Sequence, residues 1–223
     1  MHRIPMYMLF METPKQPKSI DHRILEGIAR LAAIMRADEW ANAKELGLNP
    51  TQLAILALLE GRKNGLGVKD IAAHLGVSQP SATDSINALE KKEHVEKRAG
   101  LTDGRAVRVH ISAKGLAALE TDATSNLTGQ ALASLGDAEQ QQLLVTLVKM
   151  IRHLQEKDAI PVQRMCVTCR YFDPLIHQGE EQPYHCHFVN APFGQRELRV
   201  DCRDHEQADP AFRAATWEAF HTG

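Results

Sequence analysis

All four cysteines of this 223-residue chain lie between residues 166 and 202, and the residues before them contain none. Cys166 and Cys169 stand three apart, and the single cysteines Cys186 and Cys202 follow, with the spacing C-x2-C-x16-C-x15-C. Two thiols three apart in a turn can point at one ion or cluster. Four thiolates are the ligand set of many structural zinc sites and of iron–sulfur clusters. The spacing therefore predicts a metal centre.

The ligand chemistry leaves the identity of the metal open. Zinc ribbons usually supply two C-x-x-C pairs, whereas here the second pair is split. One C-x-x-C pair with two single cysteines is a pattern that iron–sulfur clusters use. We therefore favour an iron–sulfur cluster, 4Fe–4S or 2Fe–2S, over zinc, with a reactive metal-free thiol sensor as a third alternative. His185, His187 and His205 adjoin the cysteines and could replace one as a ligand, or could be ordinary solvated loop histidines.

The charges divide the chain into a basic middle and an acidic end. The net charge is −2, but residues 61–115 hold ten Lys or Arg against six Asp or Glu, and residues 159–223 hold six Arg against nine Asp or Glu. A basic segment fits a nucleic-acid partner. No apolar run approaches the roughly 20 residues of a membrane span. Because we find no export signal, we expect a reducing, cytoplasmic location. No nucleotide loop or catalytic motif occurs, so we predict no enzyme.

The basic middle predicts a winged helix. The stretch VKDIAAHLGVSQPSATDSINALEKK (68–92) predicts two short helices joined by the tight turn GVS (76–78). Residues 94–112 form two strand-like runs around TDG (102–104), a hairpin signal. The second helix of such a unit can enter a major groove, and the wing can place Arg105 at phosphates or in a minor groove.

Long helices are predicted on either side of this unit. Residues 19–45 have helical spacing with Ser19 as the N-cap, and a buried helix follows at Pro50. A long helix is predicted from Ala113, and another over 137–157. The apolar stripes of the first and last of these helices are Ile20, Ile24, Ile28, Leu31, Ile34 and Met35, and Leu143, Leu144, Leu147, Val148, Ile151 and Leu154. We expect them to form a dimer interface, as a two-fold DNA site requires.

Residues from about 19 to 157 resemble the MarR family of winged-helix transcriptional regulators. The resemblance rests on VSQPSATDSINALEKK for the recognition helix and DGRAVRVHISAKG for the wing. The family's Asp-x-Arg, Leu-Thr and Gly correspond to Asp103, Arg105, Ile111, Ser112 and Gly115. The resemblance implies a homodimer on a pseudo-palindromic operator, dimerised through its first and last helices. It also implies, as an alternative signal, a small aromatic effector.

By the same match, Gln79, Ser81 and Thr83 would face bases and Arg105 would anchor the wing. The whole predicted DNA-binding set is Ser78, Gln79, Ser81, Thr83, Asp84, Asn87, Lys91, Arg98 and Arg105. Two positions depart from the family, because Asp84 and Ala88 stand where basic residues are frequent. An aspartate repels phosphates but can accept a hydrogen bond from cytosine N4, so we expect a shallow salt dependence.

The tail after residue 165 is too short to bury much core alone and is expected to need a staple. It is similar in outline to high-potential iron–sulfur proteins, although their usual Trp beside the last cysteine is missing. The matching residues are Cys166, Cys169, Tyr171, Phe172, Cys186, Phe188, Gly194 and Cys202. The resemblance implies that the aromatic residues screen a cluster from water. A final helix is predicted over 209–220, with Phe212, Thr216 and Phe220 along one side.

The predicted fold is mainly α with a small β wing: a winged helix-turn-helix with long dimerisation helices and a small irregular tail stapled by a four-cysteine metal site. We expect a disordered leader (1–18), a DNA-binding and dimerisation domain (19–157), a linker (158–165) and the tail (166–223). The favoured function is a homodimeric, sequence-specific regulator whose cysteine centre senses redox state or iron. The alternatives are a regulator responding to a small aromatic ligand with purely structural zinc, and a redox protein or electron carrier.

Overall fold

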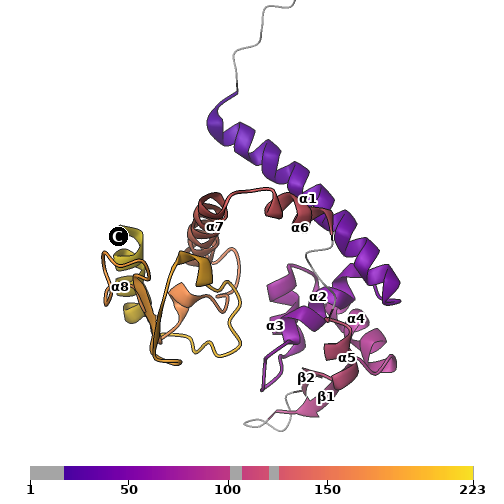
Figure 1. Cartoon of the computed structure of the whole chain (residues 1–223). Helices are drawn as coiled ribbons and strands as arrows, with labels where there is room; N and C mark the ends of the chain where they lie inside the picture. The colour runs from indigo at the N-terminus through magenta and orange to yellow at the C-terminus, as the bar shows by residue number, and fades with distance from the viewer. Residues whose placement is uncertain (1–17, 101–106, 121–125, 223) are drawn as a thin grey trace, which may run out of the picture.

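The structure is a computed structural model that describes residues 18–100, 107–120 and 126–222 (Figure 1). The winged-helix part consists, in chain order, of α1 (Ile20–Glu45), α2 (Pro50–Leu59), α3 (Val68–Leu75), α4 (Gln79–Lys91), β1 (Val95–Ala99), β2 (Val107–Ile111) and α5 (Ala113–Ala117). The remaining elements are α6 (Leu127–Ala133), α7 (Asp137–Glu156), the 3-10 turns η3 (Cys166–Thr168) and η4 (Gln195–Glu197), the strands β3 (Phe172–Asp173), β4 (Tyr184–Cys186) and β5 (Ala191–Phe193), and α8 (Pro210–Thr222).

Polar caps set the starts of the first helices where the sequence predicts them. The Ser19 hydroxyl accepts the amide of His22 at the start of α1. Asn49 and Gln52 form a reciprocal capping box at the start of α2. Gly76 ends α3 with φ +63, a left-handed conformation that favours glycine and turns the chain into α4. The expected helix-turn-helix is therefore present.

The core of the winged-helix part lies between α2, α3, α4 and the wing. Its fully buried side chains come from each of these elements and include Ile55, Leu59, Ile71, Ile86 and Val109. Because α2 and α3 pack against both α4 and β2, the recognition helix and the wing share one rigid support.

The wing is a two-stranded antiparallel hairpin. Val95 pairs with Ile111 and Ala99 pairs with Val107. Leu66, in the α2–α3 loop, adds an isolated antiparallel bridge to Val109. The predicted turn at 102–104 and Arg105 lie outside the described residues.

The prediction of a long helix from Ala113 is wrong. The helix that begins there, α5, ends at Ala117, and a separate short helix, α6, follows the undescribed residues 121–125. Asn126 starts α6 by accepting the amide of Gly129. The amide and hydroxyl of Thr128 also donate to the Asp38 carboxylate of α1, which ties α6 to α1. These local caps and the tie to α1 favour a new helix over continuation of the first.

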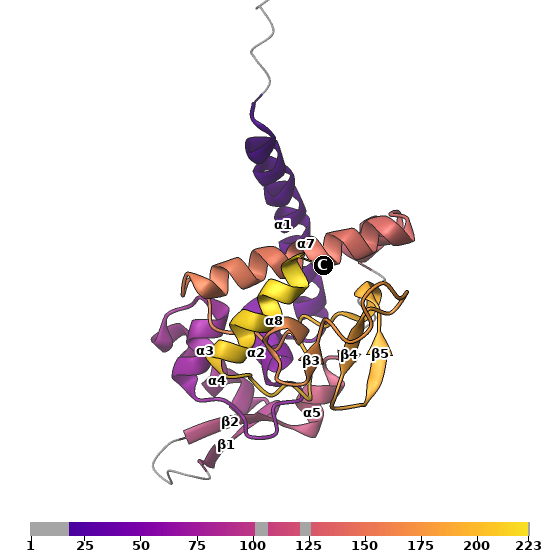
Figure 2. The same ribbon diagram turned by 90° about the vertical axis from the view of Figure 1, so that its left-hand side faces the viewer.

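The tail folds against α7. Its three short strands form an antiparallel sheet in the order β3-β4-β5, and α8 runs beside this sheet (Figure 2). A second core joins Val145 and Val148 of α7 to Met165, Phe172 and other tail residues. The tail therefore buries apolar surface together with α7, which agrees with the expectation that it is too short to bury much core alone.

Two expectations at the tail's borders need correction. The predicted linker, 158–165, ends in Arg164 and Met165, and both are buried, so these two residues are part of the tail's packing. In α8 the predicted apolar side is only partly right. Thr216 and Phe220 are buried, whereas Phe212 is 42% exposed because the core uses the far end of the helix.

Three helices carry exposed apolar faces. In α1 all six residues of the stripe predicted from the sequence are exposed, and the N-terminal part of the helix projects from the rest of the molecule in both views (Figures 1 and 2). Leu127 and Leu132 of α6 and Leu147 and Leu154 of α7 are also exposed. Within the described part of the chain, no helix combines the length and apolar character needed to cross a bilayer.

Candidate metal centre and DNA-binding surface

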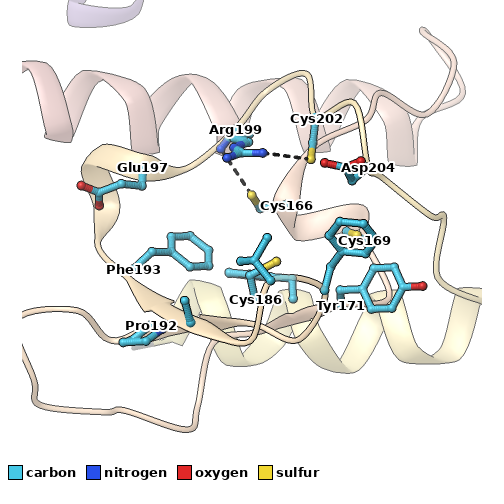
Figure 3. Close-up of a pocket in the computed structure, with 14 residues that line it drawn as sticks. Cys166, Cys169, Tyr171, Cys186, Pro192, Phe193, Glu197, Arg199, Cys202 and Asp204 are labelled. Atoms are coloured by element: carbon cyan, nitrogen blue, oxygen red, sulfur yellow. Dashed lines mark hydrogen bonds between the residues drawn. The ribbon is translucent and has the colours of Figure 1, made fainter. Parts of the chain in front are cut away.

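The four cysteines converge from three separate segments of the tail. The η3 turn carries Cys166 and ends at Cys169, so both side chains of the C-x-x-C pair reach the same place. Cys186 comes from β4, and Cys202 comes from the loop after η4. All four side chains line one cavity (Figure 3). This shared cavity agrees with the prediction that cysteines distant in the sequence lie close together in the fold.

The cavity between the thiols has a volume of about 190 Å³ and aromatic walls. Tyr171, Phe172, Phe188 and Phe193 line it, and Phe172 packs against Phe193 with ring centroids 5.9 Å apart. No three Cys, His, Asp or Glu side chains in the described ranges are close enough together to hold a single metal ion. The four thiols therefore line a cavity and do not converge on one ion position.

Arg199 contacts two of the four thiols. Its backbone amide donates to Cys166 Sγ at 3.3 Å, and its Nη1 lies 3.6 Å from Cys202 Sγ (Figure 3). The hydrogen bond from the backbone amide is of the kind that stabilises a metal-bound thiolate. The guanidinium places a positive charge beside the site. The sequence carried no signal for this role.

Burial is the main influence on the thiols. It raises the pKa of Cys166 to about 11, against the lowering effect of the Arg199 amide, and the other three cysteines raise the pKa further. Burial also raises the pKa of Cys169. A buried thiol of this kind is protonated at neutral pH, which makes it a poor nucleophile without a metal. A bound cation would supply the charge that makes the thiolate form stable.

The neighbouring histidines are engaged elsewhere. His185 lies between His177, at 3.2 Å, and Asn190, at 3.3 Å. His187 Nε2 is 3.5 Å from the Asp173 carboxylate. None of the three histidines considered from the sequence lines the cavity.

His205 is held inside the tail, with Nε2 3.0 Å from the Thr168 hydroxyl. Burial lowers its pKa, so the neutral ring is favoured. Of the residues considered as ligands, the four cysteines are the set that the cavity brings together.

The recognition helix α4 exposes most of the predicted DNA-binding residues. Ser78, Gln79, Ser81, Asp84, Asn87 and Lys91 are exposed on α4 or at its start. Two predicted base-reading hydroxyls already have partners in the chain. Ser81 Oγ lies 2.8 Å from Ser78 Oγ, and Thr83, which is half-buried, donates to the Gln79 carbonyl at 2.9 Å. Gln79 is therefore the better candidate for base contact.

Lys97, which no sequence pattern singled out, links α4 to the wing. Its Nζ donates to Asn87 Oδ1 and to the Glu90 carboxylate, both at 2.7 Å. Asn87 is thus partly used in positioning β1. Arg98, which was selected, pairs with Glu96 on the exposed face of β1.

Arg108 is a second functional residue that the sequence left unassigned. Its Nε donates to the Asn64 carbonyl at 3.1 Å, and its Nη2 donates to the Gly65 carbonyl at 2.9 Å. A Cβ at Gly65 would lie 2.4 Å from the Val109 carbonyl oxygen, so this close approach requires glycine. Arg108 therefore fixes the base of the wing to the α2–α3 loop.

The fold matches solved winged-helix structures. The transcriptional regulator SlyA is 24% identical with a TM-score of 0.51, and the match covers 60% of this chain and 95% of that one. A MarR transcriptional regulator from Methanosarcina mazei Go1 is 21% identical, with a TM-score of 0.52 and 60% and 98% covered. A MarR protein from Peptoclostridium difficile DA00132 is also 21% identical, with a TM-score of 0.52 and 66% and 96% covered. These likenesses confirm the predicted winged-helix fold.

Residues 46–106, from the end of α1 into the wing, match the sequence model of the MarR family. This segment of the chain is therefore similar to the MarR family. This match agrees with the resemblance to the MarR family that the sequence predicts for the segment. The family match ends well before Cys166, so it says nothing of the cysteine centre.

Proposed function

We propose that this MarR-type protein is a homodimeric, sequence-specific transcriptional regulator whose tail holds an iron–sulfur cluster and senses redox state or iron. The exposed polar side of α4 and the wing support operator binding. The exposed apolar stripe of α1 and the exposed leucines of α7, Leu143, Leu147 and Leu154, support a second copy as partner, because apolar faces are rarely left in water. The rest of the stripe predicted on α7 packs against the tail: Val148 is buried there, and Leu144 and Ile151 are partly buried against the same core. A two-fold dimer presents two recognition helices to a pseudo-palindromic operator.

The observation that carries the cluster proposal is the cavity that all four thiols line together with aromatic side chains. A single zinc ion holds four sulfurs at about 2.3 Å from its centre, which places them in mutual contact. Here four thiols line a cavity of about 190 Å³, and no three candidate ligands in the described residues are close enough for one ion. A space of this kind suits a cluster of several atoms better than an ion.

The chain's own residues have distinct roles at this site. Cys166, Cys169, Cys186 and Cys202 would hold the group, which supplies one-electron redox chemistry and lability to oxidants when bound. Arg199 would offset part of the negative charge of a thiolate-ligated cluster. The aromatic walls exclude water from one side, whereas Phe188, 50% exposed, stands where the cavity meets solvent. Such a partly open site allows a small oxidant to reach it.

The first experiment determines the metal in protein purified without oxygen. We expect a brown protein with iron and inorganic sulfide, broad visible absorption that bleaches in air, and loss of the colour in the Cys186→Ser variant. A colourless protein with about one zinc per chain would overturn the cluster and leave a structural staple. A protein that keeps its cluster but transfers electrons without binding operator DNA would be an electron carrier.

The second part of the proposal is tested by operator binding. The holo and apo forms are compared on a selected operator fragment at fixed salt concentration, because salt alone changes such affinities strongly. We expect them to differ by about 5- to 150-fold, the usual range of coupling between two sites. Equal affinity of the two forms would overturn redox or iron sensing while leaving the DNA-binding function intact.

A second cavity favours the alternative signal, a small aromatic acid. It has a volume of about 260 Å³, is lined by leucines of α6 and α7, and includes Arg196, which pairs with Asp137. Thermal-shift measurements with a panel of aromatic acids test it, with Arg196→Met as the matched variant. Stabilisation that Arg196→Met removes would support the effector, and no shift with any acid would exclude it.

A further inference from the structure

The loop that carries Cys202 also joins the tail to the winged-helix part. Asp201, just before Cys202, accepts two hydrogen bonds from Arg164, at Nε and at Nη2, the latter 2.8 Å long. Arg203, just after Cys202, pairs with the carboxylate of Glu60 at the end of α2. The two neighbours of one cysteine therefore point outward, while the cysteine itself lines the cavity.

Two arginines, Arg164 and Arg203, make close contacts with the end of α2. Arg164 is buried, and its Nη2 also donates to the Glu60 carbonyl at 3.0 Å. A Cβ at Gly61 would lie 2.6 Å from the Cγ of Arg203, so the arginine stem crosses directly over this glycine. Gly61 has φ +67, which any other residue would adopt with strain. Arg203 is therefore closely packed against Gly61.

Backbone hydrogen bonds also connect the loop that carries Cys202 to the segment that carries Cys166. The Cys202 amide donates to the Arg164 carbonyl at 2.8 Å, and the Cys166 amide donates to the Arg199 carbonyl at 3.0 Å. Any group that binds Cys166 and Cys202 would therefore fix residues 199–203 against residues 164–166.

Beyond Glu60 the contact continues to the wing. The α2–α3 loop begins at Glu60, and its other end holds β2 through the Arg108 bonds to Asn64 and Gly65 and through the Leu66 bridge. The path from the cysteine cavity to the wing thus passes through one short loop, with packed or hydrogen-bonded contacts at each step.

We propose that residues 199–204 are a latch: held by the occupied cysteine centre, they clamp the end of α2 and the α2–α3 loop and so fix the wing, and emptying of the centre frees them. This inference rests on the proposed cluster, and it names the route of regulation. It requires an order-to-disorder change confined to a loop, one of the recurrent devices of switching proteins. The latch differs from a route through α7, which shares the tail's core but not these contacts.

The test compares holo and apo protein in wild type and latch variants. Arg203→Met removes the exposed ion pair, and Arg164→Gln with Arg203→Met removes the buried contacts as well. The matched control is Arg170→Met, whose ion pair with Glu206 lies within the tail. Iron content and the visible spectrum confirm that each variant still carries the cluster.

We expect the ratio of holo to apo operator affinity to be unchanged in Arg170→Met, reduced at least about twofold in Arg203→Met and reduced to near one in the double variant. Latch variants that keep the full wild-type ratio and an intact cluster would overturn the latch. A wild type without a cluster, or with a ratio of one, would overturn the proposed function instead, so the two failures are distinguishable.

Hydrogen exchange gives a second readout that needs no DNA and covers the case in which the double variant does not fold. On removal of the cluster from wild type, we expect faster exchange in residues 199–204, in the α2–α3 loop and in β2. Arg203→Met should show part of this increase while the cluster is still bound. Faster exchange confined to α7 and α8, with the loop unchanged, would overturn the latch in favour of the dimerisation helix.

Discussion

At the scale of single residues, Cys166 shows what burial does to a candidate ligand. Burial raises the pKa of its thiol to about 11, whereas the Arg199 amide, which donates to the same sulfur, favours the thiolate. The site is therefore prepared for a charged sulfur but leaves it protonated until a cation arrives. Because the ligand is the thiolate, metal binding must displace a proton.

This proton competition predicts a pH dependence. The metal-free thiol is protonated below its pKa, so metal affinity is lost as the pH falls and increases as the pH rises toward about 11. We expect the apparent affinity of apo protein for ferrous iron, supplied with sulfide to rebuild the cluster, to fall at least about tenfold from pH 7.5 to 6.5 for each thiol proton that binding displaces. Titration followed by thiolate-to-metal absorption measures this. Equal affinities at the two pH values would show that the thiols are already ionised.

On α4, Gln79 and Lys91 are expected to have different effects on DNA binding. Both are exposed, but Gln79 lies in the first turn, the part of a recognition helix that reaches base edges, and Lys91 is its last residue. We expect Gln79→Ala to cost about 1–3 kcal/mol on the operator and to relax the preference at one base pair. Lys91→Ala should weaken all sequences alike and reduce the salt slope by about one. Fluorescence anisotropy over a salt series separates the two, and identical profiles would refute the assignment.

At the scale of elements, the joint between the wing and α5 depends on one glycine. Ser112 caps α5 by accepting the amide of Gly115, and its hydroxyl donates to the Glu93 carbonyl at 2.7 Å. A Cβ at Gly115 would lie 2.2 Å from the His94 carbonyl oxygen. The end of β2, the start of α5 and the end of α4 therefore meet where no side chain fits.

Alanine at Gly115 and alanine at Gly76 are expected to destabilise the fold for different reasons, a steric clash in the first case and an unfavourable backbone conformation in the second. We expect Gly115→Ala to lower the free energy of unfolding by several times the roughly 1 kcal/mol expected for Gly76→Ala. Gly76 is left-handed, but its added Cβ would meet nothing within 4 Å. Urea unfolding followed by circular dichroism measures both variants. A Gly115→Ala protein as stable as Gly76→Ala would show that α5 shifts freely, against the packing described here.

At the scale of the whole molecule, α7 has two apolar faces: one packs against the tail, and the other is exposed and available to a second copy of the chain. One face, with Val145 and Val148, closes the core of the tail, and another, with Leu147 and Leu154, is exposed like the stripe of α1. The tail is thus attached to an element that we expect to lie at the dimer interface. Any second copy would cover the exposed face while the tail stays on the other.

The dimer is tested by one charge on α1. Leu31 is 57% exposed within the stripe, so Leu31→Glu should leave the monomer folded but place a charge in the interface. We expect the mass in solution to fall from that of two chains to that of one, with loss of operator binding. Leu175→Glu, at a leucine 52% exposed on the tail, is the matched control and should stay dimeric. A dimeric Leu31→Glu protein would place the interface elsewhere.

Local patterns predicted the winged helix well, because its helix caps and turn residues act within a few positions of the chain. Ser19, Ser78 and Gly76 have the roles expected of them. The tie between Asp38 and Thr128, which supports a separate helix α6, joins residues 90 positions apart, and no local pattern contains such a contact. The convergence of Cys166 and Cys202 was foreseeable from ligand chemistry, whereas the roles of Arg199 and Arg164 depend on tertiary packing alone.

The shared core of α7 and the tail also bears on how such a protein can evolve. Arg152 of α7 is buried, with its guanidinium 5.9 Å from the ring centroid of Trp217 in α8, and Val148 is 1% exposed in the same core. A gene that lost the segment after Glu156 would encode a helix with its buried face suddenly in water. Deletion of the tail would therefore have to be accompanied by substitutions in α7, so the two segments are expected to be inherited together.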